Sequence, residues 1–131
     1  MKILYLFMLI VSLSFVSAGP PDIIDKTAEL IKEGNIHELA SSFSSSVELT
    51  VLDQENVYSN FQAESVLSNF LKRNQPKSVK ILHRICSNAN YRFAVLILAT
   101  NNGSYRMSLS LKNVNGRFEL NELRIETEKA K

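Results

Sequence analysis

KSVKILHRICSNANYRFAVLILATNNGSYRMSLSLKNVNGRFELNELRIE, residues 77–126, is the stretch that decides the fold. Apolar and polar residues alternate along most of it, and a period of two residues is typical of β-strands. Turn signals divide the stretch at residues 87–90, at Asn102-Gly103 and at Asn115-Gly116. An Asn-Gly pair suits a type I′ hairpin turn, because both central residues of that turn need a positive φ. The stretch therefore predicts four antiparallel strands in a meander.

Two of these strands carry further information. Residues 91–100 are apolar on both faces, which predicts a central strand that is covered on each side. In the last strand the apolar residues change face after Leu120, because Leu123 and Ile125 have the other parity. One extra residue near Asn121-Glu122 would restore a single buried face, so we predict a β-bulge there.

The residues before this stretch begin with two short amphipathic helices. Asp22 is suited to cap the first helix, and Gly34 is suited to end it. Asn35 starts the second helix in a pattern that resembles a capping box. Apolar residues at helical spacing continue this second helix as far as Phe43.

A small hairpin and a longer helix follow. Residues 47–58 alternate around a polar turn and predict the hairpin. Ser59 and Gln62 form a capping box, and Pro76 lies just beyond the end of the helix that they begin. This third helix carries the strongest apolar stripe of the chain, which consists of Phe61, Val66, Leu67, Phe70 and Leu71.

The order of these elements predicts an α+β fold. We expect three N-terminal helices, with the small hairpin before the third, to pack on a curved four-stranded antiparallel sheet and to form a cone. The length suits one compact domain, residues 19–131.

The first residues have the pattern of a secretory signal peptide. Lys2 precedes an apolar and hydroxylic row, residues 3–16, and Val16-Ser17-Ala18 resembles a cleavage site. We therefore expect residues 1–18 to be a signal peptide and the protein to be exported, to the periplasm or the extracellular space. No stable membrane anchor is expected after cleavage.

Charge and cysteine content exclude several classes of function. The chain has 15 Lys and Arg against 13 Asp and Glu, mixed along its length, which argues against a nucleic-acid surface. His37, His83 and Cys86 show no metal-ligand spacing, and no cofactor motif is present, so we predict neither a metal nor a cofactor. We expect Cys86 to be buried as a small apolar residue, with a reactive thiol or an intermolecular bridge as the alternatives.

The mature chain resembles the nuclear-transport-factor-2-like superfamily, also called the cystatin-like cone, in its order of elements. It is also similar to a bacterial family of small exported proteins with that fold and no assigned activity. The residues that carry this second resemblance are Glu48-Leu49-Thr50, 58–67, Ile81-Leu82-His83, Tyr105-Arg106 with 109–112, and 123–126. The resemblance implies a cone whose open end is a pocket between the long helix and the inner sheet face.

Four residues are candidates for lining such a pocket: His83, Tyr58, Phe70 and Arg106. His83 is in phase with Val79, Ile81 and Ile85, so its ring would point toward the helices, where an imidazole could act as a base or donor. The competing interpretation is a hydrogen-bonded histidine at the edge of the core, with Arg106 extending into water.

Two functions follow from these residues. The first is a non-enzymatic module that binds a small apolar or amphiphilic ligand, or a protein partner. One such partner is a second copy of the chain that pairs through the sheet. The polar row Arg106, Ser108 and Ser110 is a candidate dimer face for this pairing. The alternative is a small lyase or isomerase, with His83 as the base and Tyr58 or Tyr91 as the oxyanion donor.

Overall fold

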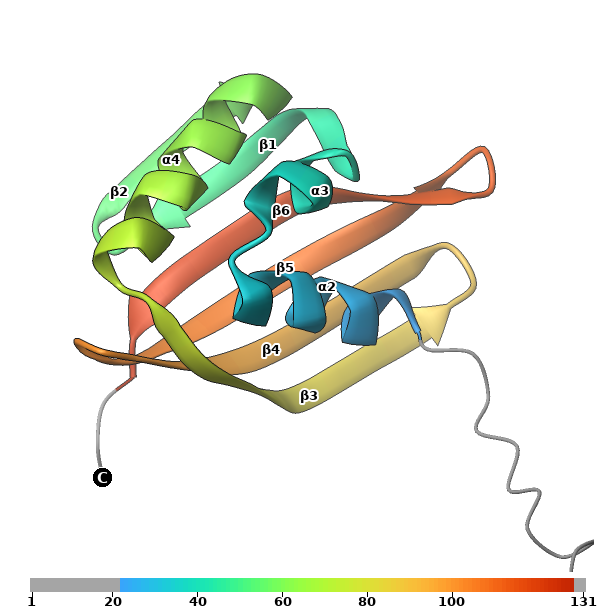
Figure 1. Ribbon diagram of the computed structural model, residues 1–131. Helices are drawn as coiled ribbons and strands as arrows, with labels where there is room; N and C mark the ends of the chain where they lie inside the picture. The colour runs from blue at the N-terminus through green and yellow to red at the C-terminus, as the bar shows by residue number, and fades with distance from the viewer. Residues whose placement is uncertain (1–21, 129–131) are drawn as a thin grey trace, which may run out of the picture.

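A computed structural model describes residues 22–128 of the chain (Figure 1). The predicted signal peptide, residues 1–18, lies outside the described residues. Within residues 22–128, none of the helices is long and apolar enough to span a membrane. The elements in chain order are α2 (Ile23–Glu33), α3 (Ile36–Ala40), β1 (Phe43–Val51), β2 (Gln54–Ser59), α4 (Asn60–Arg73), β3 (Pro76–Asn88), β4 (Tyr91–Thr100), β5 (Gly103–Val114) and β6 (Arg117–Thr127).

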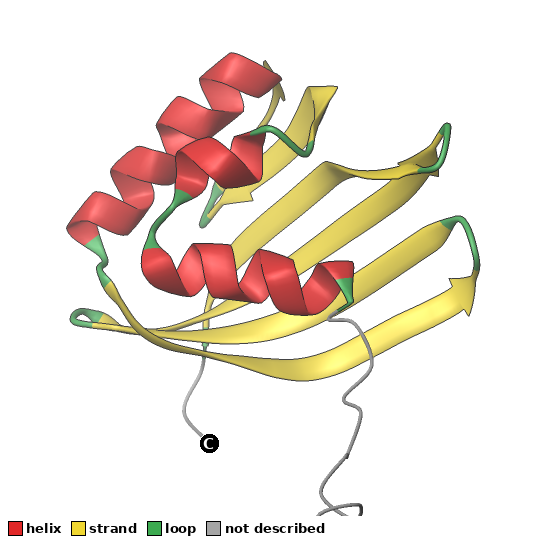
Figure 2. Ribbon diagram, turned by 45° about the vertical axis from the view of Figure 1, so that its right-hand side comes forward, coloured by secondary structure: helices red, strands yellow, loops and turns green. Residues whose placement is uncertain are grey.

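The strands form one curved sheet of six strands in the order β2-β1-β6-β5-β4-β3. All three described helices lie on the same face of it (Figures 1 and 2). The prediction of an α+β cone with a curved sheet is confirmed, but the predicted number of four strands is wrong. The hairpin β1–β2 joins the main sheet, because β1 pairs in parallel with β6, with Leu49 beside Leu123. Both side chains are buried, so the pairing extends the core by one hairpin.

The two first helices begin and end for local reasons. The Asp22 carboxylate caps α2, Asp25 accepts a hydrogen bond from the Asp22 N–H at 3.3 Å, and Gly34 ends the helix at φ 72°. The αL conformation at this position favours glycine. Helix α3 is shorter than predicted, because the chain turns at Ser41 and Phe43 already begins β1.

Helix α4 follows its predicted capping box. The Ser59 hydroxyl accepts a hydrogen bond from Gln62 N–H at 3.2 Å, and the Gln62 side chain accepts one from Ser59 N–H at 3.3 Å. Most of the predicted stripe faces the sheet, but Phe61 does not and is 79% exposed. The buried members of the stripe are Leu67, Phe70 and Leu71.

The core fills the space between the helices and the sheet. The Phe70 ring packs edge to face against the Tyr105 ring, with centroids 5.1 Å apart. The largest fully buried side chains are Ile24, Ile31, Leu39, Leu49, Leu67, Leu96, Leu98, Met107, Leu109, Leu111, Leu120 and Leu123. At about 1.5–3 kcal/mol for each large side chain buried, these contacts supply most of the stabilisation of the fold.

Two of the β-bulges in the sheet set which side chains near the candidate residues face the helices. Ser110 lies opposite Glu122 while Leu111 lies opposite Leu120, so Asn121 is the extra residue and the predicted bulge is confirmed. A second bulge, at Leu82 in β3, was not predicted. It exchanges the two faces of β3 for the residues that follow it, because an unpaired residue shifts the parity of a strand.

The face of the sheet opposite the helices is here called the outer face. In β4 it carries Phe93, Val95 and Ile97, which lie opposite Ser110, Ser108 and Arg106 of β5. The prediction that β4 is covered on both sides is wrong, because no helix within residues 22–128 lies against the outer face (Figure 2). Neighbouring side chains alone reduce the exposed fraction of Val95 to 8%.

Candidate functional site

The residues predicted to share a pocket lie on opposite faces of the sheet. His83 lies opposite Val95, which belongs to the outer face, whereas Ile81 lies opposite the core residue Leu96. The prediction that His83 points toward the helices is therefore wrong, and the cause is the bulge at Leu82 between these two residue pairs. The His83 side chain is exposed.

Arg106 and Tyr91 share the outer face with His83. Arg106 is exposed, and its Nε donates to Glu128 Oε2 at 3.0 Å. The Tyr91 hydroxyl donates to Ser110 Oγ at 3.0 Å, and Tyr91 is 37% exposed. The polar groups of Arg106 and Tyr91 thus bond to nearby side chains and do not line a common cavity with His83.

Tyr58 and Phe70 lie on the helix side instead. Tyr58 packs against the core, and its hydroxyl accepts a hydrogen bond from Asn56 Nδ2 at 3.2 Å. Phe70 is 3% exposed and is part of the core itself. Because the sheet separates Tyr58 from His83, these two side chains cannot act on one substrate. The version of the predicted lyase or isomerase site that joins His83 to Tyr58 therefore has no geometric support.

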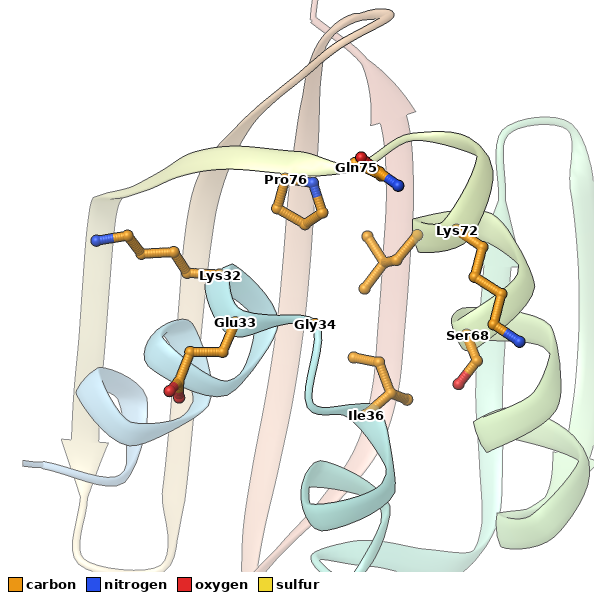
Figure 3. A pocket seen from close by; sticks show the side chains of 9 residues that line it. Lys32, Glu33, Gly34, Ile36, Ser68, Lys72, Gln75 and Pro76 are labelled. Atoms are coloured by element: carbon orange, nitrogen blue, oxygen red, sulfur yellow. The ribbon is translucent and has the colours of Figure 1, made fainter.

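A groove of about 370 Å³ lies beside the end of α4, where the sequence did not predict one. Its walls come from the end of α2, the start of α3 and the end of α4, and they include Ile36, Leu71 and Pro76. Figure 3 shows the side chains of Lys32 and Lys72 extending away from the groove. The groove therefore offers a small apolar floor without a converging charged group.

The bulge at Leu82 also directs Arg84 toward helix α2. Arg84 Nη1 donates to Asp25 Oδ2 at 2.9 Å, and the second guanidinium nitrogen binds the other oxygen of the same carboxylate. Hydrogen bonding to this guanidinium holds the pKa of Asp25 below its usual value. The Arg84–Asp25 ion pair holds the start of α2 against the edge strand β3. Its role is structural, because each side chain satisfies the hydrogen-bonding groups of the other.

The most unusual electrostatic feature of the outer face is a pair of carboxyl groups. Glu48 of β1 lies directly beside Glu122 of β6 in the parallel register. Burial raises the pKa of Glu122, and hydrogen bonding and repulsion from Glu48 raise it further, while Arg124 opposes the shift. Like charges directly opposite each other on neighbouring strands destabilise a sheet. This pair is therefore a cost that the fold itself does not require.

Glu122→Gln should stabilise the protein at pH 7 by about 0.5 kcal/mol, because it removes that repulsion. The folded pKa of Glu122 lies above its unfolded value of 4.5, so the penalty is present above the folded pKa and is lost once the pH falls below 4.5. The melting temperatures of both proteins at pH 7 and pH 3.5 measure this. Glu126→Gln on the same strand is the control, and an equal gain there at pH 7 would contradict the assignment to Glu122.

The remaining candidates for chemistry are dispersed. Cys86 is exposed, so the prediction that it is buried is wrong, because β3 is an edge strand with one free side. In the part of the chain that the structure describes, no group of three or more His, Cys, Asp or Glu side chains is placed to hold a metal ion. His37 is exposed and its Nδ1 lies 3.1 Å from Glu64 Oε2.

Comparison with known structures agrees with this arrangement. A DUF4783 family protein from Bacteroides uniformis is 21% identical at a TM-score of 0.78, over 83% of this chain and 100% of that chain. Another from Bacteroides fragilis is 23% identical at a TM-score of 0.76, over 82% of this chain and 100% of that chain. A designed protein of the nuclear-transport-factor-2 type with a long sheet is 20% identical at a TM-score of 0.63, over 78% of this chain and 94% of that chain.

These likenesses confirm the nuclear-transport-factor-2-like fold that the sequence resembles. No curated protein gives a significant match to the chain. The family model for DUF4783, described as a domain of unknown function, matches residues 24–126. That match covers most of the chain and nearly all of the described residues. The chain therefore belongs to the DUF4783 family.

Proposed function

We propose that this domain is a non-enzymatic interaction module that pairs with a second copy of itself through the outer face of the sheet. The observation that carries the proposal is the difference between the two faces of the sheet. The helix side is filled by the core, whereas the outer face is broad, uncovered by the described helices and partly apolar. Uncovered apolar surface of this kind marks interaction sites in soluble proteins.

The apolar side chains of the outer face are unevenly spread and strongly exposed at its two edges. Ile85 of β3 is 48% exposed and Val57 of β2 is 67% exposed. Between them, Phe93 and Ile97 of β4 are partly exposed, and Tyr91 lies at the end of the same strand. A sheet with this composition is suited to pack face to face against another sheet, about 10 Å away.

A small apolar or amphiphilic ligand has less support than a second copy. Two of the residues predicted to line its pocket, Tyr58 and Phe70, pack in or against the core. The other two, His83 and Arg106, lie on the outer face. A ligand in the groove beside α4 would meet the apolar Ile36, Leu71 and Pro76. The charged side chains of Lys32 and Lys72 extend away from the groove and would not fix the orientation of a ligand.

We also propose that the pairing takes place after export, because the sequence of residues 1–18 predicts a signal peptide. Protein made from the full chain and recovered from the exported fraction is the material to test. Its mass would show whether it begins at Gly19.

Sedimentation equilibrium of this protein should show a monomer–dimer equilibrium. Ile85→Glu should weaken the dimer by at least about tenfold, since a buried unpaired charge costs more than 1.4 kcal/mol. Phe61→Glu is the matched control, because Phe61 is also strongly exposed but lies on α4, away from the sheet's outer face. A natural chain that stays monomeric at millimolar concentration, or an equal effect of both variants, would overturn the proposal.

A further inference from the structure

The charges of the outer face are separated into two halves. Strands β3 and β5 carry the basic side chains there, namely Lys80, His83, Arg106 and Lys112, and the outer face of β4 between them carries no charge. Strands β6, β1 and β2 carry mainly acids, namely Glu48, Glu55, Glu119, Glu122 and Glu126, with Arg124 among them. The face is therefore basic toward one edge of the sheet and acidic toward the other.

The strand register arranges these side chains in straight rows that cross the sheet. One row runs from β3 to β2 through His83, Val95, Ser108, Arg124, Thr50 and Glu55. The next row runs in the same direction through Ile85, Phe93, Ser110, Glu122, Glu48 and Val57. The first row thus begins with a base and ends with an acid, and the second begins and ends with an exposed apolar residue.

On the basis of the proposed pairing, we infer that the second copy is related by a two-fold axis that runs along the strands between β5 and β6. Rotation about this axis lays each row over its own reverse. It places His83 of one copy toward Glu55 of the other, and Ile85 toward Val57. Each half of the face then meets the half of opposite charge, which is the arrangement that favours association.

The alternative two-fold axis, perpendicular to the strands, is disfavoured by the same charges. It would place β1 and β2 of one copy over β1 and β2 of the other. The acidic strands that carry Glu48, Glu55 and Glu122 would then face the same acidic strands of the other copy, and like charges across an interface cost several kcal/mol. The repulsion between Glu48 and Glu122 within one chain would increase further. Under the inferred axis these acids face strands without acidic side chains on their outer face, so this added repulsion is avoided.

The test uses two doubly substituted chains whose changes lie at opposite edges of the sheet. One is Glu48→Lys with Glu55→Lys, and the other is Lys80→Glu with His83→Glu. The two sets of positions do not pair within a chain, because three or more strands separate them. Each variant alone should dimerise at least about tenfold more weakly than the natural chain, since its altered half now meets a half of like charge.

An equimolar mixture of the two variants should recover a heterodimer within about threefold of the natural affinity, because both contacts are again between opposite charges. Sedimentation equilibrium measures the dimers, and thermal unfolding confirms that each chain is folded. Should a double variant fail to fold, Glu55→Lys alone and His83→Glu alone repeat the design at exposed positions on the edge strands.

The outcomes separate the axis from the proposed pairing. If the natural chain is monomeric, the proposed function fails and the axis fails with it. If the natural chain dimerises and both variants do so equally well, the acidic halves already face each other and the inferred axis is wrong. Variants that are weak alone and stay weak when mixed would also overturn the axis, while the proposed pairing would stand.

Discussion

Phe70→Ala should lower the free energy of unfolding by about 4 kcal/mol, the cost of removing a fully buried aromatic ring and leaving a cavity. The ring is 3% exposed and packs edge to face against Tyr105, so the surrounding helix and sheet cannot easily close the space. Chemical denaturation followed by circular dichroism measures the change.

Phe61→Ala is the matched control for this substitution, because it removes the same ring from the same helix. Phe61 is 79% exposed, and its removal should change the free energy of unfolding by less than about 0.5 kcal/mol. The comparison also decides between core and pocket. If Phe70→Ala were no more costly than Phe61→Ala, Phe70 would line an open cavity, as the sequence suggested, and the filled core described above would be wrong.

Leu96→Ala should cost about 3 kcal/mol, because Leu96 is fully buried on the helix side of β4. Ile97→Ala, one residue further along the same strand, should cost only about 1 kcal/mol in the monomer, because Ile97 is partly exposed on the outer face. Denaturation at a concentration well below the dimer dissociation constant measures both.

The two substitutions on β4 also report on association. Ile97→Ala should weaken the dimer, because it removes apolar contact from the outer face, whereas Leu96→Ala should leave the dissociation constant unchanged for chains that remain folded. Equal losses of stability at Leu96 and Ile97 would mean that both faces of β4 are covered, which is what the sequence of this strand had indicated.

Local signals in the sequence predicted most elements of the fold correctly. Hydrogen bonds between residues that are close in the chain form the cap at Asp22, the capping box at Ser59 and the stop at Gly34. The bulge at Asn121 was visible because Leu120 and Leu123 have opposite parities, and both must reach the core. Such signals are readable because each involves only a few neighbouring residues.

The second bulge could not be found in this way. Val79, Ile81 and Ile85 keep the same parity through Leu82, so the alternation of β3 continues without a visible slip. The bulge exchanges the faces, but the outer face beside β4 is itself apolar, and Ile85 therefore lies next to Phe93 instead of the core. The predicted position of His83, and with it the predicted pocket, was wrong because of this bulge.

The place of the hairpin β1–β2 was also beyond the sequence pattern. Alternation at residues 47–51 predicts a strand with one buried face, but it does not say which strand lies beside it. The parallel pairing with β6 joins segments that are about seventy residues apart, and it depends on the fit of Leu49 beside Leu123. The carboxyl pair Glu48–Glu122 results from the same pairing and was therefore hidden as well.

The parallel contact between β1 and β6 has a consequence for the timing of folding. As the chain emerges, whether from synthesis or from export, α2, α3 and the first hairpin can form early, but β1 gains its second neighbour only when Arg117 and the residues after it have also emerged. Contacts between such distant segments are slow to form, because a long loop must close first. Completion of the chain, and not growth of its first half, is therefore the event that permits the domain to close, and a product truncated before β6 would be a substrate for proteases.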